Sequence, residues 1–460
     1  MKKLLALLLV STMLFCCAGC AAPASSSSAP SQADTAKTES KTEESKVEST
    51  AEMAKEIDFY AAILKEEGCT EAVKGFTEKT GIKVNVHSYD SADFVQAFMV
   101  ASNGGSPVDV MLLNGQDVRA FTKNGLLQDV SKLPAVARLT DAAINQYTLN
   151  GKLYGIGAKG GNSSGVYVNL DVLKKYQVEP PKTMQDMIDI NNKLKADGLS
   201  FFGFGGGNKY MWPMWYFSAF AQTSDDKPIE RTEEILTGKA KFTDPDSIEA
   251  FKVIETLAKE NMFQPGFNGT DSDGGKAIFV NGQSAAYYGG TWEISGLRDA
   301  GMENIELIPF PIVKEGAKSI QTGNASDGAY TIYSKIDPAR QSAAEAFIDY
   351  MASDETVTSF RTSESADLRD YSRVNCNKNV PIADPSDPLN LAHMEFLETM
   401  TFTHLDWIYP PEITSELQDT LQALTGLQIT PEDAGKQMQV VMDKLLADGY
   451  DYNAVTQMKK

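Results

Sequence analysis

The residues best suited to contact a ligand lie in the run Gly290-Thr291-Trp292-Glu293. An indole beside a glycine pair can present a flat apolar plate, because glycine lets a second surface approach closely. Residues 284–288 are typical of a buried strand that stops at Gly289-Gly290, and Thr291 is a favourable N-cap for a following helix. This pattern predicts that Trp292 stacks on a ligand from the first turn of that helix. The alternative is that Trp292 packs in a hydrophobic core.

A denser aromatic group occupies residues 210–217, directly after the glycine-rich loop 203–208. This loop lacks the Lys-Ser/Thr pair of a phosphate-binding loop, so we interpret it as a turn and not as a nucleotide site. Trp212 and Trp215 have the spacing of core residues on a helix, whereas Tyr210 is predicted to lie at the surface. A third aromatic group surrounds Trp407.

Catalytic and metal-binding motifs are weak. Residues 161–165 match the Gly-x-Ser-x-Gly pattern of hydrolases, but they are predicted to precede a strand, and a nucleophile elbow must leave a strand and enter a helix. The only histidines are His87, His393 and His404, without a zinc-binding spacing. Residues 271–274 are similar to the start of a calcium loop, but Gly282 stands where the bidentate Glu is required. No metal and no other cofactor is expected.

The length and charge of the chain limit its architecture and its partners. A chain of 460 residues exceeds the size at which one core keeps growing, so two lobes are expected. The formal net charge of −20 disfavours nucleic acid, because the field of the protein would repel a polyanion. This charge says nothing about neutral ligands.

The first 53 residues have the features of export. A basic start, a short apolar stretch at 4–10 and the run Cys17-Ala18-Gly19-Cys20 predict a lipoprotein signal peptide at 1–19 and a lipid on Cys20. Secretion without a lipid is the alternative, and a redox role for this Cys-x-x-Cys run is disfavoured. Residues 20–53 are rich in Ser, Thr, Lys and Glu, which predicts a disordered tether with a span on the order of 30 Å.

The chain after the tether alternates between strands and helices. A strand at 56–62, a helix at 65–78 and a strand at 82–86 predict a right-handed βαβ unit and a parallel sheet. After a helix at 91–101 and a strand at 107–113, Asn114-Gly115-Gln116-Asp117 lies at the carboxyl end of a strand, where open α/β sheets bind ligands. A solvated turn is the alternative.

Cap residues place several further helices. Thr183 is predicted to cap a helix that runs to about residue 195. Proline is expected at the first helical position in Asp244-Pro245, Asp337-Pro338 and Thr430-Pro431. The elements together predict an α/β fold. The sequence leaves open whether Cys69 and Cys376 form a disulfide.

The order of these landmarks resembles the extracellular solute-binding proteins of bacterial ABC importers, in the branch that includes the maltose-binding protein. The resemblance covers the chain from about Glu56 to the C-terminus. Its landmarks are residues 76–84 (FTEKTGIKV), 107–110 (PVDV), 150–156 (NGKLYGI), 168–171 (VNLD) with 180–183 (PPKT), 281–286 (NGQSAA) leading to Gly290-Thr291-Trp292, and 343–351.

The resemblance implies a two-lobed periplasmic-binding-protein fold of type II, in which each lobe is a mainly parallel sheet flanked by helices and the ligand cleft lies at the hinge. Lobe I would comprise residues 54–160 and 318–370, and lobe II residues 161–317 and 371–460. Aromatic plates would come mostly from lobe II and polar partners from loops of lobe I. The candidate ligand-binding residues are Tyr60, Asn114, Gln116, Asp117, Asn162, Tyr210, Trp212, Trp292, Glu293 and Trp407.

The implied function is capture of an extracellular mono- or oligosaccharide and its delivery to an ABC permease, by a monomer that a lipid on Cys20 holds at the outer face of the cell membrane or in a periplasm. A sugar suits such a site because its C–H face is apolar while its hydroxyls require directional hydrogen bonds. Two alternatives stay open. A receptor for amino acids, peptides or polyamines would need charged groups, and a secreted glycoside hydrolase would need a second carboxylate opposite Glu293.

Overall fold

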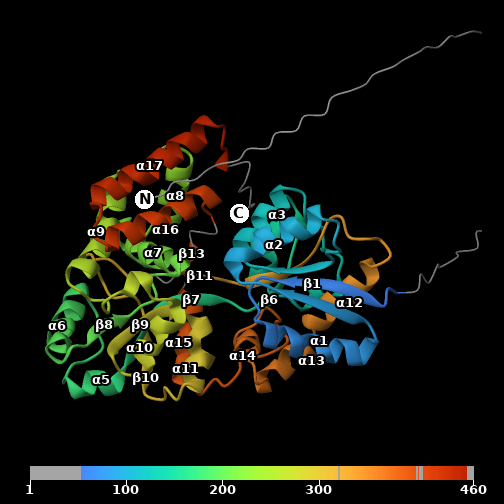
Figure 1. Ribbon diagram of the computed structural model, residues 1–460, viewed down its shortest axis with the longest axis horizontal. Helices are drawn as coiled ribbons and strands as arrows, with labels where there is room; N and C mark the ends of the chain where they lie inside the picture. The colour runs from blue at the N-terminus through green and yellow to red at the C-terminus, as the bar shows by residue number, and fades with distance from the viewer. Residues whose placement is uncertain (1–52, 320–321, 400–401, 404–407, 453–460) are drawn as a thin grey trace, which may run out of the picture. The chain divides into compact units, whose positions relative to one another are not determined.

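The computed structural model describes residues 53–319, 322–399, 402–403 and 408–452, which form two mixed β-sheets covered by helices (Figure 1). The first sheet has the strand order β2-β1-β3-β12-β6. Strand β1 pairs in parallel with β2 and β3, whereas β12 runs antiparallel to both β3 and β6. Its strands are β1 (Glu56–Ala61), β2 (Lys83–Ser88), β3 (Val110–Leu113), β6 (Ile156–Lys159) and β12 (Asp327–Ile332).

Helix α1 shows how a helix beside the first sheet buries its apolar residues. In α1, Ala72 and Phe76 are one turn apart and both are buried, which confirms the helix predicted from their spacing. A two-stranded sheet of β4 (Thr148–Leu149) and β5 (Lys152–Leu153) lies between α4 and β6 in the chain. The helices are α1 (Glu66–Thr80), α2 (Ser91–Asn103), α3 (Gly115–Lys123), η1 (Pro134–Arg138), α4 (Asp141–Tyr147), α12 (Gln341–Met351), α13 (Asp354–Ser359), η6 (Phe360–Thr362) and α14 (Ala366–Arg373).

The second sheet has the order β13-β11-β7-β9-β8, and β10 also pairs with β7. Strand β7 runs antiparallel to β9, β10 and β11, while β8 and β9 are parallel. Each sheet is therefore mainly parallel, as expected, with a single reversed strand, which is β12 in the first sheet and β7 in the second. The strands are β7 (Asn162–Asn169), β8 (Ser200–Gly203), β9 (Ser284–Gly290), β10 (Ile305–Ile308), β11 (Thr322–Asn324) and β13 (Phe402–Thr403).

An aromatic core holds the second half together. The Trp215 ring lies 4.4 to 5.4 Å, centroid to centroid, from the rings of Tyr288, Phe202, Phe204 and Phe263. Burial of each such ring contributes on the order of 2 to 3 kcal/mol. The helices are α5 (Leu170–Lys175), α6 (Met184–Leu194), η2 (Lys195–Asp197), η3 (Lys209–Met211), α7 (Trp212–Thr223), α8 (Pro228–Leu236), α9 (Pro245–Lys259), η4 (Phe267–Gly269), α10 (Ser272–Val280), η5 (Thr291–Glu293), α11 (Ile294–Asp299), α15 (Pro388–Thr399), α16 (Pro411–Thr425) and α17 (Pro431–Ala447).

The chain passes between the two sheets at Gly160-Gly161, which joins β6 to β7, and returns at residues 325–326 between β11 and β12. We call Gly160-Gly161 the crossing. A Cβ atom on Gly160 would overlap the backbone of Val374, so only glycine fits there. A further passage leads from α14, which contacts β6, to α15, which contacts β7 and β10.

Several predicted boundaries need correction. The Gly-x-Ser-x-Gly match lies mostly within β7 and not before it, because residues 162–164 pair with β9 or β11. Strand β9 continues through Gly290. Pro245 and Pro431 open helices as predicted, whereas the helix expected at Pro338 begins at Gln341. Residues 322–324, expected in lobe I, pair with strands of the second sheet.

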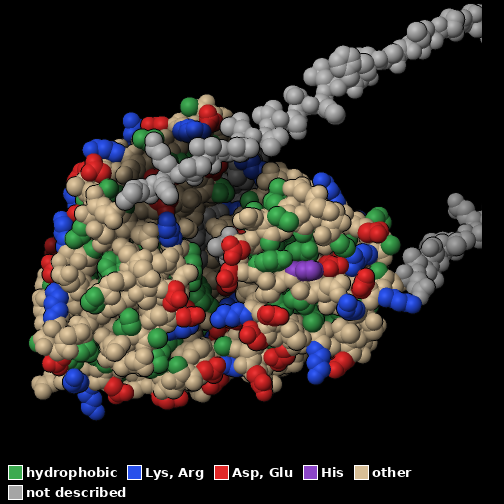
Figure 2. Space-filling view, in the orientation of Figure 1, with side chains coloured by type: hydrophobic (Ala, Val, Ile, Leu, Met, Phe, Trp, Pro, Cys, Tyr) green, Lys and Arg blue, Asp and Glu red, His purple; other side chains and the backbone are tan. Residues whose placement is uncertain are grey.

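The surface drawn in Figure 2 carries acidic and basic side chains interspersed with one another. Within the described part of the chain, no helix combines the length and the apolar character that crossing a membrane requires. The expected signal peptide, Cys20 and nearly all of the tether lie outside the described residues.

Candidate ligand-binding site

Sheet topology places the candidate residues at two edges that the crossing joins. Strands β3 and β6 are both antiparallel to β12, so Leu113 and Lys159 end at the same edge of the first sheet. Strand β7 is antiparallel to β9, so its first residue, Asn162, lies at the edge where β9 ends. We call the edge of the first sheet where β3 and β6 end the first edge; it carries Tyr89 and residues 114–117. We call the edge of the second sheet where β9 ends the second edge; it carries Tyr210, Trp292 and Glu293.

On the first edge, the polar residues are held by the start of α3. Asn114 is the N-cap, and its Oδ1 accepts a hydrogen bond from the backbone N–H of Asp117 at 3.3 Å. Gln116 is exposed, whereas Asp117 is only 9% exposed. Burial raises the pKa of Asp117 to about 7, although the bond with Asn114 acts in the opposite direction. The carboxylate is thus largely desolvated, and it is suited to accept hydrogen bonds from ligand hydroxyls.

Tyr60 and Tyr89 form an aromatic stack on the same sheet. The Tyr60 ring is buried and stacks on His87 at a centroid distance of 4.3 Å, and on Tyr89 at 6.3 Å. Tyr89 is 36% exposed and directly follows β2. Tyr60 therefore supports the stack, and Tyr89 is the ring that a ligand could reach. Sequence reasoning missed Tyr89, although the strand-end rule that selected Asn114 also applies to it.

On the second edge, Trp292 lies in the 3-10 turn η5 and is partly exposed. Its ring covers Gly290 so closely that a Cβ atom there would overlap the indole. The Gly290 carbonyl is fixed because it accepts a hydrogen bond from the Tyr167 hydroxyl at 2.9 Å. Thr291 is not the N-cap that we predicted, because Gly290 occupies the cap position. The indole is partly buried, packs against the hydrophobic core and lies against Gly290, so its position is fixed while part of it stays exposed.

Glu293 is buried and paired. Its Oε2 lies 3.0 Å from Lys276 Nζ, and its Oε1 accepts a hydrogen bond from the Tyr287 hydroxyl at 3.2 Å. Burial lowers the pKa of Lys276, but Glu293 and Asp273 outweigh it and the net pKa is raised. Glu293 is therefore an ion-paired carboxylate whose partners fix the turn that carries Trp292.

Tyr210 is 51% exposed, in agreement with its predicted surface position. Its hydroxyl lies 3.2 Å from Ser272 Oγ at the start of α10, the helix that also carries Lys276. Enclosure of the hydroxyl raises the pKa of Tyr210, and the Glu293 carboxylate adds to this effect. The structure thus groups Tyr210, Lys276 and Glu293, which the sequence separates by up to 83 positions.

The remaining candidates are Trp212, Asn162 and Trp407. Trp212 is fully buried and its Nε1–H donates to the Gly206 carbonyl at 3.1 Å, so it belongs to the core and cannot stack on a ligand in this arrangement. Asn162 is buried at the crossing, where its Oδ1 accepts from Asn324 Nδ2 at 3.3 Å. Trp407 is outside the described residues.

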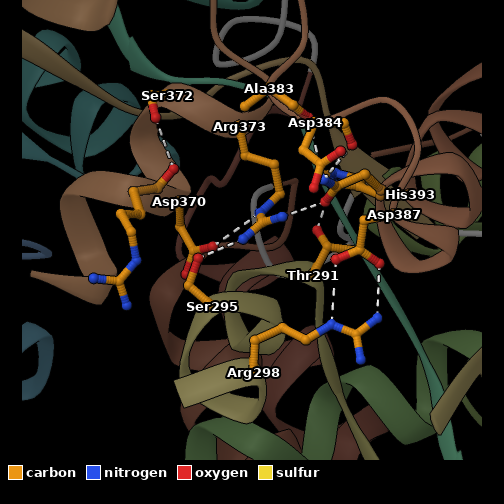
Figure 3. A network of polar contacts seen from close by, with 12 residues as sticks. Thr291, Ser295, Arg298, Asp370, Ser372, Arg373, Ala383, Asp384, Asp387 and His393 are labelled. Atoms are coloured by element: carbon orange, nitrogen blue, oxygen red, sulfur yellow. Dashed lines mark hydrogen bonds and ion pairs between the residues drawn. The ribbon is translucent and has the colours of Figure 1, made fainter. Parts of the chain in front are cut away.

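A polar network joins Thr291, which precedes Trp292, to residues of α11, α14 and α15 (Figure 3). His393 Nε2 lies 3.1 Å from Thr291 Oγ1 and 3.0 Å from the Gly161 carbonyl oxygen. Arg373 Nε donates to Asp370 at 3.2 Å, and its other nitrogens contact Asn390 and Ser295. Neither His393 nor Arg373 was singled out from the sequence, because their partners are distant along the chain.

Cysteine and metal chemistry add little to the site. Cys69 and Cys376 are both buried and free. Asp271 caps α10 by accepting from the Gly274 N–H at 2.7 Å, which fits the turn that we expected there. The residues that the structure describes contain no group of three or more His, Cys, Asp or Glu side chains arranged to hold a metal ion.

Comparison with known sequences gives distant relatives. A galactooligosaccharide-binding protein of Bacillus subtilis (strain 168) is 24% identical over 264 residues, which are 55% of this chain and 59% of that protein. A maltodextrin-binding protein of the same organism is 22% identical over 287 residues, or 62% of this chain and 66% of that protein. The chain thus spans less than two thirds of the length of these relatives.

Solved structures share the fold. A chitin oligosaccharide binding protein superposes with a TM-score of 0.73 at 20% identity, covering 86% of this chain and 100% of that chain. A solute-binding protein in complex with raffinose gives a TM-score of 0.70 at 17% identity, with coverage of 85% and 99%. The two-lobed α/β fold is therefore confirmed. The family model for bacterial extracellular solute-binding proteins matches residues 71–385, and the chain belongs to this family.

Proposed function

We propose that this protein captures an extracellular carbohydrate, a mono- or oligosaccharide, and delivers it to the membrane subunits of an ABC permease. The observation that carries the proposal is the partly exposed Trp292 ring at a strand end, together with the exposed Tyr210 ring on the same edge. Relatives named for galactooligosaccharide and maltodextrin, and a fold shared with a raffinose complex, support the same ligand class.

The chemistry of the two edges matches the two surfaces of a sugar. The C–H face of a pyranose is apolar and stacks on an aromatic ring, which Trp292 and Tyr210 offer. The ring hydroxyls need hydrogen-bond partners with fixed directions, and Asn114, Gln116 and Asp117 supply amide and carboxylate groups from the start of one helix. We propose that a sugar binds between the edges and contacts both.

Binding of this kind couples to motion. The halves built on the two sheets would act as lobes that hinge at the crossing and at the other passages between the sheets. A ligand that contacts both edges has a higher affinity for the closed arrangement and therefore shifts the population toward it. We propose that the closed, loaded form is what the permease recognises.

The protein would act without turning over its ligand. A glycosidase needs two carboxylates about 5 to 10 Å apart across the sugar. Glu293 is occupied by Lys276 and Tyr287, which argues against its use as a general acid. We further propose that a lipid on Cys20 and the 20–53 tether hold a monomer at the outer face of the membrane.

A thermal-shift screen tests the ligand class. Purified protein is heated with single mono- and oligosaccharides, including maltotriose, raffinose and a chitin oligosaccharide, and with amino acids and polyamines. A ligand that binds only the folded state raises Tm, so we expect at least one sugar to do so. A rise with an amino acid or polyamine and with no sugar would overturn the proposal. Release of reducing ends from an oligosaccharide would overturn the non-catalytic assignment.

A further inference from the structure

We propose that Thr291 and His393 position the Trp292 plate relative to the crossing, so that the plate and the crossing move as one unit. The role of Trp292 in this inference rests on the proposed function. Thr291 directly precedes Trp292, and His393 comes from α15, about 100 residues further along the chain. The two side chains therefore tie three separate segments together.

The contacts reach the crossing at Gly161 and the start of β7 at Ser163. Thr291 Oγ1 accepts a hydrogen bond from the backbone N–H of Ser163 at 3.3 Å. His393 Nε2 lies within hydrogen-bond distance of both Thr291 Oγ1 and the Gly161 carbonyl oxygen, at 3.1 and 3.0 Å. Both side chains are almost completely buried. Rotation at the crossing must therefore displace groups to which the Trp292 turn is bonded.

The chemistry of the partners fixes the state of the histidine. A carbonyl oxygen only accepts hydrogen bonds, so Nε2 must carry the proton and donate it. Burial lowers the pKa of His393 to about 3, and the positive charges of Arg373 and Lys159 add to that effect, while the bond to Gly161 opposes it. His393 is thus a neutral donor shared between the crossing and Thr291 across the whole physiological pH range.

The helix that carries His393 is itself anchored (Figure 3). Asp387, just before α15, forms a two-pronged ion pair with Arg298 of α11 at 2.7 and 3.2 Å. Asn390 Nδ2 donates to the carbonyls of Ala383 and Asp384 at 3.1 and 2.9 Å. Because α15 is fixed, His393 links its two partners rigidly. If Thr291 and the Gly161 carbonyl moved apart, one of the two hydrogen bonds of the imidazole would be lost.

The crossing is packed too tightly to move independently. A Cβ atom on Gly161 would lie 2.8 Å from the Asn324 carbonyl oxygen and 2.9 Å from Leu397 Cδ2. Leu397 lies one turn after His393 on α15. A change of the chain path at Gly161 therefore presses on the same helix that holds His393, which gives a second contact between the crossing and this link.

The test uses the full chain with 5-fluorotryptophan and 19F NMR, and it needs no ligand. Substitution of Trp292→Phe assigns the Trp292 resonance. Gly161→Ala then perturbs the crossing in three backgrounds: parent, Thr291→Ser, which keeps the hydroxyl, and Thr291→Val, which removes it at similar volume. We expect Gly161→Ala to shift the Trp292 resonance in the first two backgrounds and to leave it unshifted in Thr291→Val. Equal shifts in all three backgrounds would overturn the proposal.

If the Gly161→Ala variant does not fold, Leu397→Ala is used in its place. Leu397→Ala changes the packing against the crossing by removing side-chain atoms. His393→Gln keeps an N–H donor and is expected to preserve the coupled shift, whereas His393→Phe is expected to abolish it. Coupling retained in His393→Phe would contradict the assigned role.

The affinity for raffinose or maltotriose is measured separately. Absence of sugar binding by the parent chain would reject the proposed function and would leave the NMR result to decide the positioning role.

Discussion

The first and second edges hold their ligand-facing groups by different means. On the first edge, Asn114 and Asp117 are fixed by the N-terminus of α3, where free backbone N–H groups require acceptors. On the second edge, Trp292 is fixed by the absence of a side chain at Gly290 and by long-range bonds to Thr291. A helix start gives directional polar groups, whereas a glycine beside a ring gives a flat apolar surface.

The difference shows how one site can satisfy a molecule with both apolar and polar faces. Each edge also contains one buried carboxyl group. Asp117 on the first edge is buried and its pKa is raised by that burial. Glu293 on the second edge is buried but paired with Lys276. Removal of the charge of Asp117 should therefore raise the free energy of unfolding, whereas removal of the Lys276 partner of Glu293 should lower it. The two edges can thus be distinguished experimentally.

The largest effect is expected for Asp117→Asn on stability as a function of pH. A pKa that burial raises from its ordinary value of 3.8 to about 7 makes the folded state bind more protons between these values, so stability falls as pH rises through this window. Removal of the charge should raise the free energy of unfolding at pH 8 by up to about 4 kcal/mol, at about 1.4 kcal/mol for each pKa unit.

Urea denaturation of the parent and of Asp117→Asn at pH 4.5 and at pH 8 measures this effect. The gain from Asp117→Asn should shrink toward zero at pH 4.5, because Asp117 is then protonated in the folded parent protein. A gain of equal size at both pH values would mean that the charge of Asp117 is not its cause. Asp93→Asn is a suitable control, since Asp93 is exposed in the first turn of α2.

Trp292→Ala should cost about 1 to 3 kcal/mol of binding free energy, which is about 5- to 150-fold in Kd for whichever sugar raises Tm. The indole is only partly buried, so the loss should appear in affinity more than in stability. Isothermal calorimetry provides the measurement. Trp292→Phe keeps a ring and should retain part of the affinity, and unchanged affinity in Trp292→Ala would remove the stacking role.

Lys276→Met should lower the free energy of unfolding by about 1 to 2 kcal/mol, because it removes the cation that pairs with the buried Glu293 carboxylate. Lys276→Arg keeps the charge and is the matched control. Chemical denaturation at neutral pH compares the two. Destabilisation by Lys276→Arg as large as that by Lys276→Met would show that shape and not charge pairing matters at this position.

Local patterns in the sequence were sufficient for the elements and for part of the site. Period and caps predicted α1, α6 and β2 within a few residues, and Thr183 with Asp186 forms a capping box at the start of α6. The exposure of Tyr210 and the turn at Trp292 also followed from neighbouring residues. Such features depend on atoms close in sequence, and a single chain is enough to infer them.

The support of the site depends on distant partners and could not be predicted. Thr291 looked like a helix cap, but its hydroxyl bonds Ser163 and His393, which are 128 and 102 positions away. The pairing of Glu293 with Lys276 had no sequence signature either. Trp212 lies in the core, as its helical spacing with Trp215 indicated, so its place among the ligand-binding candidates was wrong.

The smallest effect is expected at Tyr89, and it decides whether the first edge also contributes an aromatic surface. Tyr89 is 36% exposed and stacks on the buried Tyr60 ring, so it is supported from below as Trp292 is. Loss of one partly exposed ring contact in Tyr89→Ala should cost about 0.5 to 1 kcal/mol of sugar binding free energy, with Tyr89→Phe unchanged. Calorimetry with the sugar used for Trp292 measures both. A loss as large as that of Trp292→Ala would show that the two edges share the stacking, whereas no loss would confine it to the second edge.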